Sequence, residues 1–235
     1  MPPSRPRISP TSLALLACAL LTAHAHAEKK KSAPPALPAA QYLAFDAHEK
    51  EHVTIAADPC TEPANCSFFR LAYIQHGFLP VRVIITNDAD RALSLDDARI
   101  QFVSANNDIL PAATDEDLNR VLFTLKGTQG TKIPMPSPIP TITIHHKPVD
   151  KKITEDNDDF GFQGTVVNAH STLAGYLFYD VRRFDDPALK DAELYVKMVH
   201  SLDAKQDLFP FSIPFNKWLA AHPEVLEKAR KDNNR

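Results

Sequence analysis

The chain has 235 residues, of which 26 are Lys or Arg and 29 are Asp or Glu, so its formal net charge is −3. A slight acidic excess without a basic stripe argues against nucleic acid and anionic lipid as partners. Only six residues are glycine, which leaves no material for the glycine-rich loops that bind phosphate groups.

Residues 1–27 have the three parts of a secretory signal peptide. Two arginines, Arg5 and Arg7, precede the short apolar run TSLALLACALLTA, and small alanines stand at the two positions of AHA that a signal peptidase reads. A membrane span needs roughly 20 apolar residues, and neither this run nor any later segment is that long. We therefore expect a periplasmic or secreted protein that begins at Glu28 and has no transmembrane segment.

An alternative for this leader involves Cys18. The stretch LLAC that ends at Cys18 loosely resembles a lipoprotein cleavage box, which would leave a lipid-anchored cysteine. Because the apolar run continues past Cys18, cleavage after Ala27 is the favoured prediction.

The mature chain then keeps 24 basic and 29 acidic residues, a net charge of −5, and is long enough for one hydrophobic core.

Residues 28–40, EKKKSAPPALPAA, are charged and rich in Pro and Ala. Such a segment has little to bury, so it is predicted to be a disordered tether. From Gln41 the composition changes to short β-rich runs separated by polar turns.

The stretch HEKEH at residues 48–52 matches H-E-x-x-H, the signature of zinc peptidases. On a helix, His48 and His52 would lie on one face and bind the metal, while Glu49 would activate a water molecule. Such a helix is normally buried, but its interior positions here are Lys50 and Glu51, and β-branched residues follow at once. We therefore predict that the stretch is the polar lead-in to a strand, HVTIAA, and keep a zinc hydrolase as the alternative.

Cys60 and Cys66 are the cysteines of the mature chain. In an oxidising compartment two cysteines this close in sequence are expected to form a disulfide. So small a loop gains about 2 kcal/mol from the entropy of the unfolded chain. C-x5-C is not the C-x-x-C spacing of redox or metal sites, so a structural role that fixes a loop between two strands is predicted.

The chain from residue 41 to residue 215 is predicted to be mainly β-structure. In PVRVIITN the side chains of Val81, Val83 and Ile85 fall on one face, as in a strand that is half buried against a core. The spacing of the runs favours an antiparallel β-sandwich. The other predicted strands are FFRLAYI (68–74), ALSLDDARIQFVSA (92–105), TITI (141–144), FQGTVVN (162–168), TLAGYLFYDV (172–181), AELYVKMVH (192–200) and LFPFSIPF (208–215).

Two helices are predicted. TDEDLNRVLFTL (114–125) opens at Thr114 with acidic residues in its first turn. NKWLAAHPEVLEKARK (216–231) opens at Asn216, and Pro223 is expected to restart it, because proline fits the first turn of a helix and breaks its interior.

Between Gly130 and Gly161 the sequence is Pro-punctuated and then charged. IPMPSPIP is extended and suits a sheet edge, whereas HHKPVDKKITEDNDD is predicted to be a mobile, solvated excursion. Its acidic stretch EDNDD (155–159) suggests calcium, but it lacks the D-x-D-x-D-G register. The adjacent His145 and His146 would point to opposite faces of a strand, so no metal site is assigned to them.

No nucleophile motif is present. G-x-S-x-G does not occur, and the adjacent His170 and Ser171 are read as a turn before a strand. The sequence thus predicts no catalytic residue, no metal ligand and no cofactor.

Two stretches carry a resemblance to a known class of module. PVRVIITNDADRALSLDDARIQF resembles the strand–Asn turn–strand unit of secreted immunoglobulin-like modules of uncharacterised bacterial extracytoplasmic proteins, and AHSTLAGYLFYDV is similar to a later strand of theirs. The two stretches cover less than a fifth of the chain. The resemblance implies an immunoglobulin-like sandwich outside the cytoplasm and carries over no catalytic residue.

The sequence therefore predicts an exported, non-enzymatic β-sandwich protein that binds or supports another component of the cell envelope. Its expected parts are the signal peptide, the tether, a β-sandwich over 41–215 with an insertion at 106–160, and a C-terminal helix and tail at 216–235. A protein partner would use a sheet edge or the Pro-rich segment. The insertion departs from a minimal immunoglobulin domain.

Overall fold

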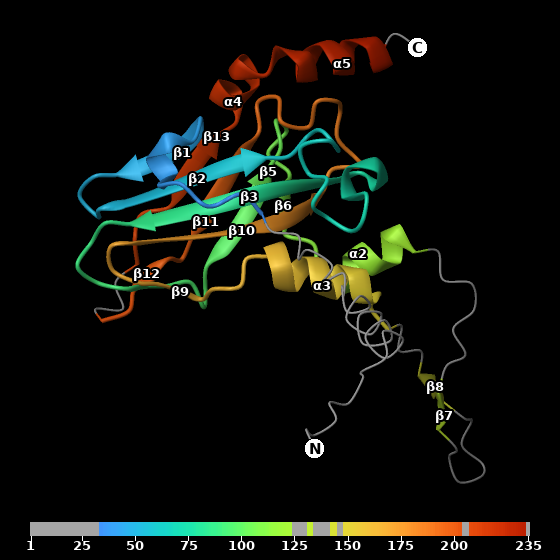
Figure 1. Ribbon diagram of the computed structural model, residues 1–235, viewed down its shortest axis with the longest axis horizontal. Coiled ribbons are helices and arrows are strands. Elements are labelled where there is room, and N and C mark those ends of the chain that lie inside the picture. The colour runs from blue at the N-terminus through green and yellow to red at the C-terminus, as the bar shows by residue number, and fades with distance from the viewer. Residues whose placement is uncertain (1–32, 124–130, 134–141, 145–147, 204–206, 234–235) are drawn as a thin grey trace, which may run out of the picture. The chain divides into compact units, whose positions relative to one another are not determined.

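The computed structural model (Figure 1) describes residues 33–123, 131–133, 142–144, 148–203 and 207–233, and these all belong to the unit that spans Ser32–Arg235. Within them the chain is mainly antiparallel β-structure with several short helices. The expected signal peptide, Cys18, most of the Pro-rich run and the pair His145-His146 lie outside the described residues.

Two four-stranded sheets carry most of the β-structure. The first sheet, in the order β1-β2-β3-β10, is built from β1 (Ala44–His48), β2 (Val53–Pro59), β3 (Phe78–Asn87) and β10 (Ser171–Asp180). The second, in the order β13-β11-β5-β6, is built from β13 (Phe211–Pro214), β11 (Glu193–Lys197), β5 (Arg99–Val103) and β6 (Ile109–Pro111).

Smaller ladders complete the β-structure. One sheet has the order β12-β4-β9, with β12 at His200–Ser201, β4 at Leu93–Ser94 and β9 at Val166–Val167. A separate pair joins β7 (Thr131–Ile133) to β8 (Ile142–Ile144). The predicted strand TITI thus appears as β8.

The two large sheets share one hydrophobic core. Val81, Val83 and Ile85 face it from β3, as the alternation predicted, and Phe102 and Leu194 face it as register partners from β5 and β11. All five side chains are fully buried. At about 25 cal/mol per Å2 of apolar surface, burial of each contributes on the order of 1.5–3 kcal/mol.

β3 is buried on its second face as well, where the sequence predicted a solvated one. The segment expected to be a disordered tether lies there: Ala39, in a 3-10 helix at Ala39–Gln41 (η2), is fully buried with Ala56 and Ile84. The backbone N–H of Ala39 donates to Thr86 Oγ1 over 2.8 Å. The tether prediction is therefore wrong for the end of the segment, because small residues let its backbone lie close to the sheet.

Four α-helices are described. They are α2 (Asp115–Leu122), α3 (Lys151–Phe160), α4 (Asn216–Ala221) and α5 (Pro223–Asn233). Thr114 caps α2 as predicted, in a reciprocal capping box with Asp117. The backbone N–H of Thr114 bonds the carboxylate of Asp117 and lowers its pKa. Pro223 does restart the C-terminal helix, and Trp218 of α4 donates to Asp58 Oδ1 over 3.3 Å.

A second core lies beneath α2 and α3 and corrects two predictions. FFRLAYI is not a strand but a set of turns leading into a 3-10 helix, η3 (Tyr73–His76), and EDNDD is not a solvated loop but part of α3. Phe69 makes edge or tilted ring contacts with several neighbours. Such aromatic packing does not require a strand. The main residues of this core are Cys60, Cys66, Phe69, Tyr73, Phe78, Leu118, Ile153, Phe160, Tyr176 and Phe178.

Candidate functional site

HEKEH forms the end of a strand and a turn, not a helix. His48 is the last residue of β1, and His52 lies in the turn before β2 with a left-handed φ of 54°. Glu49 is exposed in the same turn. The helical face on which both imidazoles could meet one metal ion is therefore absent, and no group of three His, Cys, Asp or Glu side chains suited to a metal occurs among the described residues.

His48 has another role in the structure. Its ring stacks on that of Phe211 with centroids 3.8 Å apart, its Nδ1 lies 2.7 Å from Glu51 Oε2, and its Nε2 lies 3.4 Å from Asp46 Oδ2. Phe211 belongs to β13, in the other large sheet. His48 thus joins the two sheets.

The same hairpin covers the open edge of β13. β1 and β13 are edge strands of different sheets, and they contact each other. Asp46 Oδ2 accepts the backbone N–H of Ser212 over 2.9 Å, and Glu51 Oε1 accepts that of Phe209 over 3.0 Å. Unpaired N–H groups of an edge strand invite pairing with other chains. We call this contact the seam; it is made by Asp46, His48 and Glu51 with Phe209, Phe211 and Ser212 on and just before β13.

Replacing the two motif histidines is expected to give unequal effects. His48→Ala removes the ring stack and the contacts of the imidazole with Asp46 and Glu51. It should therefore lower the free energy of unfolding by about 1–2 kcal/mol. His52→Asn keeps a residue that tolerates the left-handed backbone and should stay within about 0.5 kcal/mol of the parent. Urea denaturation of both variants measures this, and equal losses would contradict the seam.

A polar groove lies beside the seam, where three turns meet. The backbone N–H of Asp88 donates to His52 O over 2.8 Å, and that of Leu202 donates to Ala92 O over 2.9 Å. The groove encloses about 400 Å3, within the range of ligand pockets. We call it the turn groove; it is lined by Lys50, Glu51, His52, Asp88, Ala89, Asp90, Arg91, Leu93, Ser201, Asp207 and Leu208.

The wall of the turn groove at residues 88–91 is held from below by Asn87, which is fully buried. Its amide donates to Arg91 O over 2.7 Å and to Asn168 O over 3.0 Å, and its Oδ1 accepts the N–H of Ala89 over 3.1 Å. Asn87 thus bonds the backbone of its own turn, as asparagine commonly does in turns. Ser201 also lines the groove, and its buried Oγ has no hydrogen-bond partner among the described residues.

A second groove, of about 790 Å3, lies at the opposite end of β3 and β10. It lies between the turn after β5 and the segment after β10. Asp108, Asp185, Asp186 and Asp191 contribute acidic side chains, and Arg183 and Lys190 contribute basic ones. An acidic lining alone identifies no ligand.

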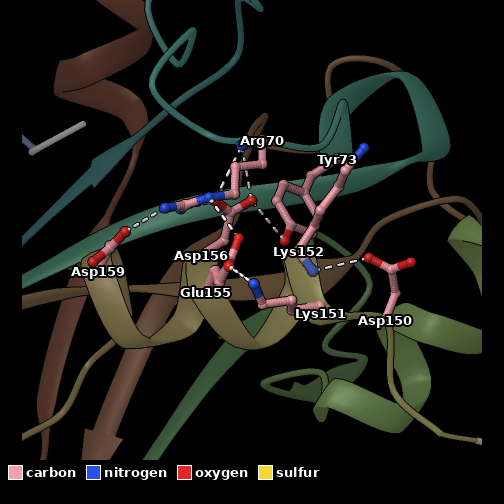
Figure 2. Close-up of polar contacts among 8 residues, drawn as sticks. All are labelled: Arg70, Tyr73, Asp150, Lys151, Lys152, Glu155, Asp156 and Asp159. Carbon is pink, nitrogen blue, oxygen red and sulfur yellow. Dashed lines mark hydrogen bonds and ion pairs between the residues drawn. The ribbon is translucent and has the colours of Figure 1, made fainter. Parts of the chain in front are cut away.

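An ion-pair network fastens α3 to the loop after the cysteines (Figure 2). The fully buried Asp156 accepts both the backbone N–H of Arg70, over 2.9 and 3.0 Å, and its Nη1, over 2.9 Å. Asp159 and Glu155 lie 2.6 and 3.1 Å from the same guanidinium. The Tyr73 hydroxyl donates to Asp156 over 3.1 Å.

The electrostatics of this network favour a structural role. The hydrogen bond to Asp156 raises the pKa of Arg70, and burial, with the nearby Asp156 charge, raises the pKa of Tyr73. Arg70 therefore stays charged and Tyr73 stays neutral. The acidic stretch that suggested calcium thus places three carboxylates, those of Glu155, Asp156 and Asp159, around the guanidinium of Arg70.

The other candidate residues are also engaged in the fold. Cys60 and Cys66 lie at disulfide distance, with Cα atoms 6.3 Å apart, and both line the second core. His170 Nε2 lies 2.9 Å from Asp90 Oδ1, whereas the Ser171 hydroxyl donates to Asn168 O. His170 and Ser171 therefore do not form a nucleophile–base pair.

Sequence reasoning missed the turn groove and the Arg70 network. Neither has a local signal, because the partners are far apart in the chain: Arg70 and Asp156 are separated by 86 residues.

Comparison of the chain with protein-family models, curated proteins and solved structures finds no match. None of the described helices is long and apolar enough to cross a membrane.

Proposed function

We propose that the protein is an exported, non-enzymatic binding or structural module of the cell envelope, with an immunoglobulin-like β-sandwich as its fold. The observation that carries the proposal is the structural role of the HEKEH residues. His48 stacks on Phe211 of β13, and Glu51 accepts the backbone N–H of Phe209 just before that strand. His52 lies in the turn before β2, away from the helical position that a metal site would need. The one motif with catalytic chemistry thus serves to join two sheets.

Export is supported by the leader and by the cysteines. The signal peptide over 1–27 is a sequence prediction, and a buried pair at disulfide distance suits an oxidising compartment. The sandwich is supported by two antiparallel sheets that share one core. An immunoglobulin-like strand order is the finer part of the proposal.

Two measurements on protein purified from its natural compartment test the proposal. The intact mass should correspond to a chain that begins at Glu28 and carries no lipid, with Cys60 and Cys66 oxidised; a lipid-modified chain that begins at Cys18 would instead show the lipoprotein alternative. Metal analysis should find zinc well below one atom per chain, unchanged by His48→Ala. Stoichiometric zinc that is lost in His48→Ala and in His52→Asn would overturn the proposal in favour of a zinc hydrolase.

A further inference from the structure

The turn groove contains charged side chains that the fold leaves unused. Lys50, Arg91, Asp88 and Asp207 line it, and no ion pair within 4.0 Å is found for any of them among the described residues. Their neighbours behave differently, because Glu51 pairs with His48 and Asp90 with His170. Two basic and two acidic groups therefore face one small groove without neutralising each other.

Exposed apolar side chains flank the segment that lines this groove. Phe209, next to Leu208, is 77% exposed, the highest value among the large hydrophobic side chains described, and Leu202, next to Ser201, is 47% exposed. Single exposed apolar residues are common on protein surfaces. Aromatic side chains, however, are enriched at protein interfaces.

The backbone of Phe209 is also held in place. Its backbone N–H is bound by Glu51 Oε1 over 3.0 Å, and the N–H of Leu208 donates to Val199 O over 2.8 Å. The opposite wall is fixed by Asn87. Walls whose backbone is already held in place reduce the entropy lost on binding.

We propose that the turn groove binds an extended polypeptide segment of a partner protein that carries one basic and one acidic side chain beside an apolar one. The inference rests on the proposed binding function. Opposite charges on the segment match the two pairs of unused charges, and an apolar side chain between them would contact Phe209. A free amino acid would satisfy the charges but would not use the exposed aromatic ring.

Capped peptides test this proposal with the full mature chain. The probe is acetyl-Lys-Ser-Leu-Ser-Asp-amide, titrated at low salt into 15N-labelled protein and followed by NMR. It should bind at least fivefold more tightly than acetyl-Gln-Ser-Leu-Ser-Asn-amide, and its affinity should fall with added salt because the charges are exposed. The shifted resonances should belong to the turn groove and to Phe209.

Matched variants locate the effect. Asp88→Asn should lower the affinity several-fold, whereas Asp185→Asn, the same change in the acidic groove at the other end of the molecule, should not. Phe209→Ser should weaken the leucine peptide more than its Ser-for-Leu analogue.

Equal binding of the charged and neutral peptides, equal effects of the two aspartate variants, or binding of free lysine or aspartate as tight as that of the peptide would each overturn the inference. Zinc analysis of the same sample reports on the proposed function separately, so the two failures can be told apart.

Discussion

Asp156→Ala should lower the free energy of unfolding by about 3–5 kcal/mol, the usual cost of breaking a buried ion pair from one side. The carboxylate is fully buried and accepts four hydrogen bonds, from the backbone and guanidinium of Arg70 and from Tyr73. Its removal leaves the Tyr73 hydroxyl and the Arg70 N–H without their acceptor. Urea denaturation followed by circular dichroism measures the loss.

Lys151→Ala is the matched control for this prediction. Lys151 belongs to the same helix and pairs with Glu155 over 3.0 Å, but its side chain is 88% exposed. Exposed ion pairs contribute little, so this variant should lose less than about 0.5 kcal/mol. A loss for Asp156→Ala as small as that for Lys151→Ala would show that the network does not hold α3 in place.

Gly175→Ala should also be strongly destabilising, by about 3 kcal/mol, at the upper end of overpacking changes. Gly175 lies in β10, and Gly161 forms a parallel bridge to the neighbouring Tyr176. A Cβ at residue 175 would come within 2.3 Å of Phe162 Cα and 2.6 Å of Gly161 O. Because both are backbone atoms, neither can yield without displacing the chain that follows α3. Thermal and urea unfolding measure this loss.

Gly164→Ala provides the comparison. A Cβ there would approach Leu173 Cδ2 to 2.6 Å, which is the far end of a flexible side chain. Rotation of that leucine should relieve the contact at a cost of about 1 kcal/mol. If the two glycine variants were equally stable, the close approach of residues 161 and 162 to β10 would be refuted.

Both predictions concern the attachment of the inserted segment, which the sequence described least well. α3 was expected to be a charged loop because KKITEDNDDF contains only two large apolar residues. Its buried face is completed by Asp156, together with Ile153 and Phe160 at helical spacing. The cost of burying a carboxylate on that face is offset only when Arg70 neutralises it.

Local chemistry did predict several elements correctly. The alternation in β3, the strand at β10, the Thr114 cap of α2 and the restart of the last helix at Pro223 all rest on neighbours within a few residues. HEKEH was correctly expected not to be a buried helix, because Lys50 and Glu51 have no place in one. Its strand β1 and its contact with β13 were not predicted.

The sequence alone thus determined the mainly β character of the protein, its turns and caps, and the pairing expected of Cys60 and Cys66, because each depends on residues close together in the chain. Tertiary structure alone decided the burial of Ala39 against β3, the Arg70–Asp156 network, the seam and the turn groove. In each of these features, the residues that meet come from segments far apart in the chain. The cost of burying a charge or a backbone N–H is offset only when folding brings its partner into contact.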